Sequence, residues 1–261
     1  MRRYDPDRYF TSLFAGGAGH RALVTLYAFN LEIARIRETV SEPMLGHIRL
    51  QWWRDTIGEI YAGTPRNHPV AVALCAVIER HAPARGRFEA MINGREADLE
   101  DHPPGTLDDL KSYARATSGE LTCLALELLG ARDETAMGIG YDAGNVWALT
   151  GLLKAVPYHA AQGRSYLPGV SGQMMQENPI SDSVRLMTKQ IAAAALDGDV
   201  NFRRNGRKLP KKFRAAVLHN VLARPELRRL EKARFDPFNC KPLTPAGRRL
   251  RVAWSSMTRK L

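Results

Sequence analysis

Apolar residues recur every three or four positions along most of the chain. One such row is Leu26, Phe29, Ile33, Ile36 and Val40, and this spacing is typical of one buried face of a helix. Strand-like alternation is nearly absent. The same spacing predicts further helices over residues 44–61, 68–82, 86–100, 107–130, 134–155, 181–198, 210–223 and 243–258.

Clusters of Gly, Pro, Ser and Asn separate these helices. The stretch from Pro168 to Pro179 has the composition of a loop, and the basic run from Arg203 to Lys212 is predicted to be a loop and a helix start. There is no internal repeat and no linker long enough to separate two domains. We therefore predict a single all-α domain over residues 1–261, built as a helical bundle.

The composition narrows the class of protein. The chain has 261 residues, of which 44% are hydrophobic and 25% charged, as in ordinary globular proteins. Three cysteines are too few and too scattered for a disulfide framework or a four-ligand zinc site. No window approaches the roughly 20 apolar residues of a membrane span, and the first residues lack the features of a signal peptide. We expect a cytoplasmic protein, with peripheral attachment to the inner membrane as an open alternative.

Positive charge is concentrated at the end of the chain. Residues 202–261 hold 18 of the 38 Lys and Arg but only 3 of the 27 Asp and Glu, a local net charge of +15, while residues 1–201 carry −4. Such a patch attracts anionic partners. Because no nucleic-acid motif is present, an anionic membrane surface or an acidic protein is favoured over nucleic acid, and a solvated face is the alternative. The candidate patch consists of Arg203, Arg204, Arg207, Lys208, Lys211 and Lys212.

Five short strings occur in the order and spacing of a known family. They are Leu26–Phe29 (LYAF), Gln51–Arg54 (QWWR), Ile92–Leu99 (INGREADL), Tyr113–Gly119 (YARATSG) and Gly163–Pro168 (GRSYLP). Together they resemble the squalene/phytoene synthase family over about residues 5–238. The resemblance implies the isoprenoid-synthase fold, a bundle of helices around a deep central cavity that holds two prenyl diphosphates in active members.

The chemistry of active members requires carboxylates on two facing helices. The pyrophosphate that leaves an allylic substrate is neutralised by magnesium ions, which carboxylates hold, and by basic side chains. We call the two stretches that carry these carboxylates in the family the first and second windows. In the first window, located by its distance from Leu26–Phe29, the family's aspartate positions fall on Ala34, Arg35 and Glu38. The helix face that would point carboxylates into the cavity reads Asn30, Ala34, Glu38. Glu38 is the one acid at these positions, and Arg35 and Arg37 add positive charge where cations would bind.

The second window has lost its acids altogether. Counted back from Gly163–Pro168, the family's acidic positions fall on Ala155, Tyr158 and His159. No Asp or Glu lies between Asp142 and Glu177, and Asp142 is about 20 Å from Ala155 along a helix at ~1.5 Å per residue. A proline at position 157 is also expected to end or kink the helix.

These losses favour a non-catalytic member that needs no cofactor. Magnesium is expected only under the alternative of an active head-to-head prenyltransferase, in which Lys154, Arg35, Arg37 and Arg164 would take over part of the charge. The candidate ligand-binding residues of the cavity are Tyr113, Lys154 and Arg164. We expect the cavity to survive as apolar volume, with or without a lipid or quinone-like tail, and lipid carriage is a second alternative.

Three further strings narrow the resemblance. Ala28–Arg35, Val40–Arg54 and Tyr158–Ala161 look like the branch of the family that contains the mitochondrial complex I assembly factor and its alphaproteobacterial relatives. The lack of a presequence suggests the bacterial form. This branch implies a role in building the peripheral arm of NADH:quinone oxidoreductase, with complex I subunits or other assembly factors as partners.

The remaining candidate residues have simpler explanations. Trp52 and Trp53 are expected in the core. Glu96 and Asp98 do not share a helix face, so they are expected at a solvated, acidic helix end rather than in a metal site. His159 has no second His at helical spacing, so no metal site is predicted there either.

Overall fold

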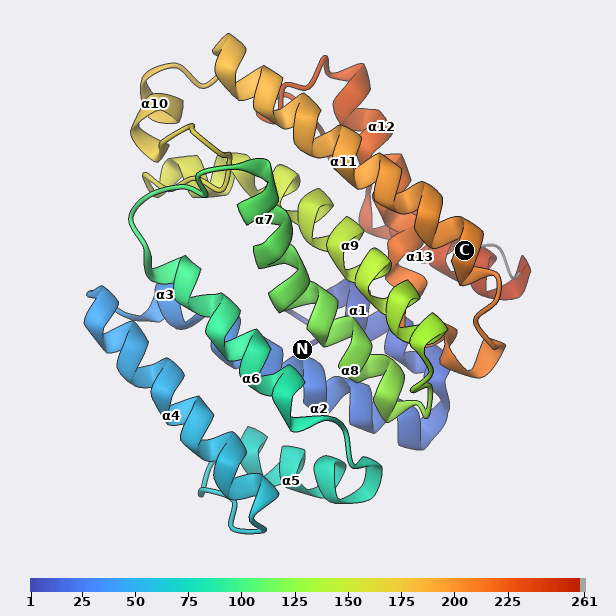
Figure 1. Cartoon of the computed structure of the whole chain (residues 1–261). Helices are drawn as coiled ribbons and strands as arrows, with labels where there is room; N and C mark the ends of the chain where they lie inside the picture. Colours follow the sequence, from blue (N-terminus) through green and yellow to red (C-terminus); the bar gives the residue numbers. More distant parts are fainter. Residues whose placement is uncertain (259–261) are drawn as a thin grey trace.

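The computed structural model describes residues 1–258, and within that range the chain is all-α with no strand. Figure 1 shows α9 running through the middle of the bundle, where it packs against α8 and α11. In chain order the helices are α1 Pro6–Ser12, α2 Gly16–Ala34, α3 Ile36–Thr39, α4 Pro43–Tyr61, α5 Pro69–His81, α6 Arg85–Gly94, α7 Leu107–Ala114, α8 Glu120–Leu128, α9 Glu134–Ala161, α10 Gly172–Glu177, α11 Asp182–Gly206, α12 Ala223–Lys232 and α13 Pro245–Thr258.

Shorter helical turns join these helices. They comprise the 3₁₀ segments η1 Leu13–Ala15, η2 Arg95–Leu99, η4 Lys211–Ala216 and η5 Leu218–Leu222 and the π-helical turn η3 Arg115–Gly119. The π-helical turn sits between α7 and α8, inside what the apolar spacing predicts to be one helix. A π turn is a common feature at functional positions, and this one carries part of the string Tyr113–Gly119.

Local sequence sets the ends of the long helices. Asp133 caps α9 by accepting a hydrogen bond from the Ala136 N–H at 2.9 Å, and Ser181 caps α11 in the same manner from the Val184 N–H. The N-terminal half of α9 packs into a core cluster with α2, α4, α5, α6 and α8, and its C-terminal half packs into a second cluster with α7, α11 and α12. Helix α9 therefore contributes to both clusters.

Several predicted boundaries are wrong. Helix α9 continues through Pro157 to Ala161, because the proline removes one backbone hydrogen bond while the packing on both sides holds the remaining turns. The loop predicted over 168–179 contains α10. Arg203 and Arg204 belong to the last turn of α11 rather than to a loop, and the helix predicted over 210–223 is two 3₁₀ segments.

Candidate functional site

The two windows that lack their carboxylates face each other across the bundle. Asn30 and Ala34 lie on α2, Glu38 lies on α3, and Tyr158 projects from α9. The Tyr158 hydroxyl donates a hydrogen bond to Glu38 Oε1 at 3.2 Å. The same carboxylate lies 3.5 Å from the Arg35 guanidinium. The surviving acid of the first window is therefore engaged by a cation of its own window and a phenol of the second.

His159 lies beside this contact in an aromatic stack. Its ring centroid is 5.5 Å from that of Tyr158 and 4.8 Å from that of Tyr166. Burial, together with the nearby Arg164 charge, lowers the pKa of His159, so the imidazole is neutral at pH 7. Its Nδ1 has no hydrogen-bond partner among the described residues.

This set of donors does not fit magnesium. The ion prefers several oxygen ligands in a near-octahedral arrangement, whereas the windows supply one carboxylate beside Arg35, the amide of Asn30, one phenol and one neutral imidazole. Within residues 1–258 no group of three or more His, Cys, Asp or Glu is arranged to hold a metal ion. We therefore derive no step through a metal at this site.

A buried polar cluster lies on the other side of the stack, centred on Asp98 in η2. The Asp98 carboxylate accepts hydrogen bonds from the Tyr113 hydroxyl at 2.7 Å and the Tyr166 hydroxyl at 2.6 Å, and Arg95 lies 3.2 Å away. Arg164 donates to the Asp98 backbone oxygen at 2.6 Å. Burial raises the pKa values of Tyr113 and Tyr166 above the ordinary value, so both phenols stay protonated and act as donors.

The prediction of a solvated acidic end at this place is wrong for Asp98. Its side chain is only 7% exposed, because η2 tightens the chain after α6 and turns this residue inward. Glu96 points outward and pairs with Arg54. A sequence signal did exist, since Asp98, Tyr113 and Tyr166 each lie in one of the strings that carry the family resemblance.

The central pocket is smaller and more polar than expected. Its volume is about 190 Å³, below the roughly 300–1,000 Å³ of typical small-molecule sites. Its lining combines polar residues, among them Arg8, Arg95 and Ser118, with apolar ones such as Leu121 and Leu152. The expectation of a large apolar cavity is therefore wrong for this hollow.

Tyr113 and Arg164 meet at a second hollow near the surface. It has a volume of about 290 Å³ and lies between these two residues, Tyr166 and the loop that contains Glu100 and Asp101. Tyr113 lines both this hollow and the central pocket. That Tyr113 and Arg164 hold a ligand stays a prediction.

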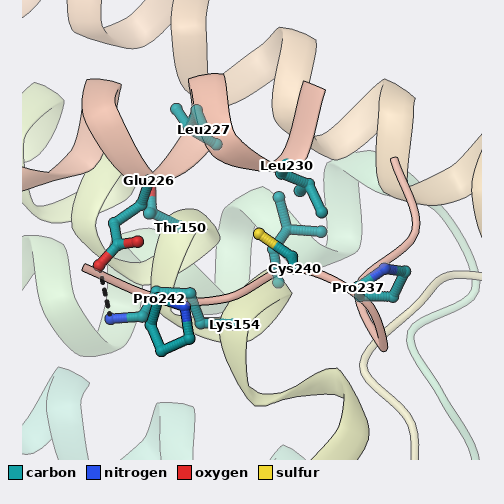
Figure 2. A pocket seen from close by; sticks show the side chains of 9 residues that line it. Thr150, Lys154, Glu226, Leu227, Leu230, Pro237, Cys240 and Pro242 are labelled. Carbon is teal, nitrogen blue, oxygen red and sulfur yellow. Dashed lines mark ion pairs between the residues drawn. The ribbon is translucent and has the colours of Figure 1, made fainter. Parts of the chain in front are cut away.

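Lys154 does not join this site. It lines a separate hollow of about 110 Å³ on the other face of α9, where its ammonium lies 3.5 Å from the Glu226 carboxylate. Figure 2 shows the two side chains directed at each other, with Cys240 further along the same hollow. Thr150 and Lys154 share this face, whereas Ala148 and Gly151 line the central pocket. The prediction that placed Lys154 with Tyr113 and Arg164 is wrong.

The basic C-terminal run separates into two parts. Arg203 lies 2.8 Å from the buried Asp199, one turn earlier in α11, so it belongs to an internal ion pair. The exposed members are Arg204, Arg207, Lys208, Lys211 and Lys212. Of the two tryptophans predicted in the core, Trp53 is buried, at 4% exposure, whereas Trp52 is half-buried and packs against the core from its edge. Among residues 1–258 we find no helix that combines the length and the hydrophobicity of a membrane span.

Comparisons with known proteins agree with the resemblance and with the branch. The family model for squalene/phytoene synthase matches residues 1–258. The chain is 30% identical to "NADH dehydrogenase (ubiquinone) complex I, assembly factor 6" of Bos taurus, over 92% of this chain and 74% of that protein. It is 30% identical to the phytoene synthase of Rhodobacter capsulatus over a shorter match, 44% of this chain and 34% of that protein.

Solved structures show the same fold. A dehydrosqualene synthase in complex with ligand has a TM-score of 0.81 at 17% identity, covering 99% of this chain and 93% of its own. A squalene synthase from Alicyclobacillus acidocaldarius has a TM-score of 0.80 at 18% identity, covering 91% of this chain and 92% of its own. The chain therefore has the isoprenoid synthase fold.

Proposed function

The chain belongs to the squalene/phytoene synthase family, and we propose that it is a non-catalytic member that supports assembly of respiratory complex I at a membrane surface. The main support for a loss of catalysis is the set of side chains that the two facing windows offer to a metal ion. One carboxylate, Glu38, remains, and Arg35 and Tyr158 already engage it.

The energetics support the same conclusion. Ionisation of an allylic diphosphate separates a carbocation from a highly charged leaving group, and a single preorganised donor or metal contributes about 3 kcal/mol to such a step. Here two of the three positions in the first window and all three in the second lack a carboxylate. Arginines do not replace this loss, because they bind a diphosphate without the polarisation that a metal cluster provides.

The cations that could rescue catalysis have other partners. Lys154 faces Glu226 on the far side of α9, Arg35 faces Glu38, and Arg37 lies 3.7 Å from Asp101. Only Arg164 of this group reaches a hollow next to the windows, and there it donates to the Asp98 backbone. These contacts support the non-catalytic proposal over an active prenyltransferase.

The assembly role comes from the relatives. Proteins of cattle, mouse, human and rat that match most of this chain bear the name complex I assembly factor 6. Two phytoene synthases match only 44% and 54% of the chain. We therefore propose complex I subunits or other assembly factors as partners, and the excess positive charge of residues 202–261 supports action next to an anionic surface.

Three measurements test the proposal. The purified protein is incubated with farnesyl or geranylgeranyl diphosphate and Mg²⁺, with an active phytoene synthase as the positive control. We expect no pyrophosphate release above a heat-killed sample, and turnover above that sample would overturn the non-catalytic assignment.

In a strain of the source organism that lacks the gene, we expect reduced complex I, and complex I subunits should co-purify with the tagged protein. Normal complex I levels would overturn the assembly role.

A further inference from the structure

Helix α13 carries an apolar stripe that nothing in the described chain covers. Leu250, Trp254 and Met257 are 72%, 68% and 79% exposed. Spacings of four and three residues place them on one side of the helix. The opposite side is packed on the protein, since Val252 and Ser255 are buried. Contiguous exposure of large apolar side chains marks an interaction surface.

The stripe continues onto a neighbouring part of the surface. Met257 lines an open hollow of about 600 Å³ together with Phe14 of η1 and with Lys211 and Lys212 of η4. The Phe14 side chain is also exposed, at 43%. The apolar side chains of α13 and η1 therefore border the same basic residues.

The exposed charged residues that border the stripe are basic. Arg249 and Arg251 flank Leu250 on its two sides, because successive residues are turned about 100° around a helix of 3.6 residues per turn, and both are exposed. The elements η1, η4, η5 and α13 contain no Asp or Glu. From residue 237 to residue 258 there are four Lys or Arg and no acid. This surface therefore complements a negatively charged partner.

The helix is held in place by ion pairs at its inner side. Arg248 pairs with Asp7 of α1 and with the buried Glu226 of α12, and its Nε lies 3.0 Å from Asp7 Oδ1. Glu226 also accepts a hydrogen bond from the Leu243 N–H at 3.3 Å, just before the helix. The stripe is thus presented on a helix that is fixed to the body of the protein.

We propose that α13 docks flat on an anionic phospholipid bilayer, with Leu250, Trp254 and Met257 at the boundary between headgroups and acyl chains. Arg249, Arg251, Lys211 and Lys212 contact the lipid phosphates. An apolar stripe bordered by cations is the pattern of interfacial helices, and Trp favours this depth of the membrane. The inference deepens the proposed action at a membrane surface and rests on it. It moves the docking surface from the run 203–212 to α13, with only Lys211 and Lys212 in common.

Vesicle flotation tests the docking surface. Vesicles of phosphatidylcholine with phosphatidylglycerol are compared with vesicles of phosphatidylcholine alone. We expect the protein to float with the anionic vesicles only. The triple variant Leu250→Ser, Trp254→Ser, Met257→Ser should bind them at least about tenfold more weakly, because the buried apolar area is lost. Lys211→Glu with Lys212→Glu should weaken binding by about fivefold or more per charge and reduce its salt dependence, while Arg249 and Arg251 keep part of it.

A matched control lies on α4. Met44 and Ile48 are 65% and 58% exposed, and α4 is well separated from α13 in Figure 1. Met44→Ser with Ile48→Ser should leave vesicle binding unchanged. Circular dichroism confirms that each variant is folded before it is compared. Equal binding by the α13 triple variant and the parent protein overturns the inference, as does a parent protein that ignores anionic vesicles or binds only acidic proteins.

Trp254 supplies a second readout that a structural role of α13 would not produce. On addition of anionic vesicles its fluorescence should shift to shorter wavelength and be quenched by brominated acyl chains, and Trp254→Phe should remove this response. If vesicle binding fails while the deletion strain still has reduced complex I, the docking inference and the proposed action at a membrane surface fall, and the assembly role stands. If vesicle binding holds while complex I is normal, only the assembly role falls.

Discussion

The contact between α9 and the π-helical turn predicts that one methyl group will destabilise the fold. A Cβ added to Gly144 would lie 2.5 Å from the Gly119 Cα and 2.6 Å from the Gly119 nitrogen, and it would also clash with the Ser118 oxygen. All three are backbone atoms, so no side chain can rotate away. Helix α9 would have to move from η3 by about 1 Å to reach ordinary van der Waals contact.

The magnitude follows from two opposing effects. Overpacking of this kind costs about 1–3 kcal/mol, and backbone contact favours the upper end. Alanine regains about 1 kcal/mol of helix propensity relative to glycine. We expect Gly144→Ala to lower the free energy of unfolding by about 2 kcal/mol, which corresponds to a Tm decrease of about 4–8 °C for a chain of this size.

Gly138 provides the control in the same helix. A Cβ there would meet no atom within 4 Å, so Gly138→Ala should raise the Tm by about 2–4 °C through propensity alone. The assay is thermal unfolding followed by circular dichroism under one set of conditions. If Gly144→Ala proves as stable as Gly138→Ala, the close approach of α9 to the π-helical turn is wrong, and so is the shape of the central pocket between them.

Four further predictions concern the polar groups. Asp98→Asn leaves the Arg95 charge without its carboxylate and should lower the free energy of unfolding by about 3 kcal/mol in urea titration. Burial, together with the Arg8 charge, depresses the pKa of His219 well below 6.5, so stability should fall as pH drops below 6.5, by about 1.4 kcal/mol per pH unit; His219→Gln should remove that share of the slope. Glu226→Gln should speed hydrogen exchange in α13 and leave α4 unchanged. Millimolar Mg²⁺ should not shift the Tm, whereas a shift would indicate a binding site in the folded state.

The sequence predicted the helical class because amphipathic spacing extends over most of the chain. Long periodic stretches such as 44–61 and 134–155 correspond to α4 and to most of α9. Boundaries were less predictable where tertiary packing overrides local preference. Pro157 lies inside α9 although proline disfavours a helix interior, and residues 115–119 form a π turn although the apolar spacing continues through them.

The sequence indicates which positions of the site lack a carboxylate, but not where the other polar groups of the site lie. Register from the family strings predicted which positions lack a carboxylate, and the structure brings Tyr158 of the second window within hydrogen-bond distance of Glu38 of the first. Asp98 could not be located from spacing, because its burial depends on η2 and on two tyrosines that lie 15 and 68 residues away. The position of Lys154 could not be predicted from its helix alone. Its side chain lines the hollow next to Glu226, whereas Gly151 of the same helix lines the central pocket.

The remaining groups at the two windows form a set of contacts that needs no ion. Several carboxylates facing each other would repel unless a metal ion, a proton or a basic side chain lies between them. Here Glu38 has Arg35 and Tyr158 as partners, and His159 is neutral and stacked between tyrosines. Beside them Asp98 has an arginine and two phenols. Because Glu38 and Asp98 have partners within the protein, the fold needs no ion at these positions, and this agrees with the proposed non-catalytic role.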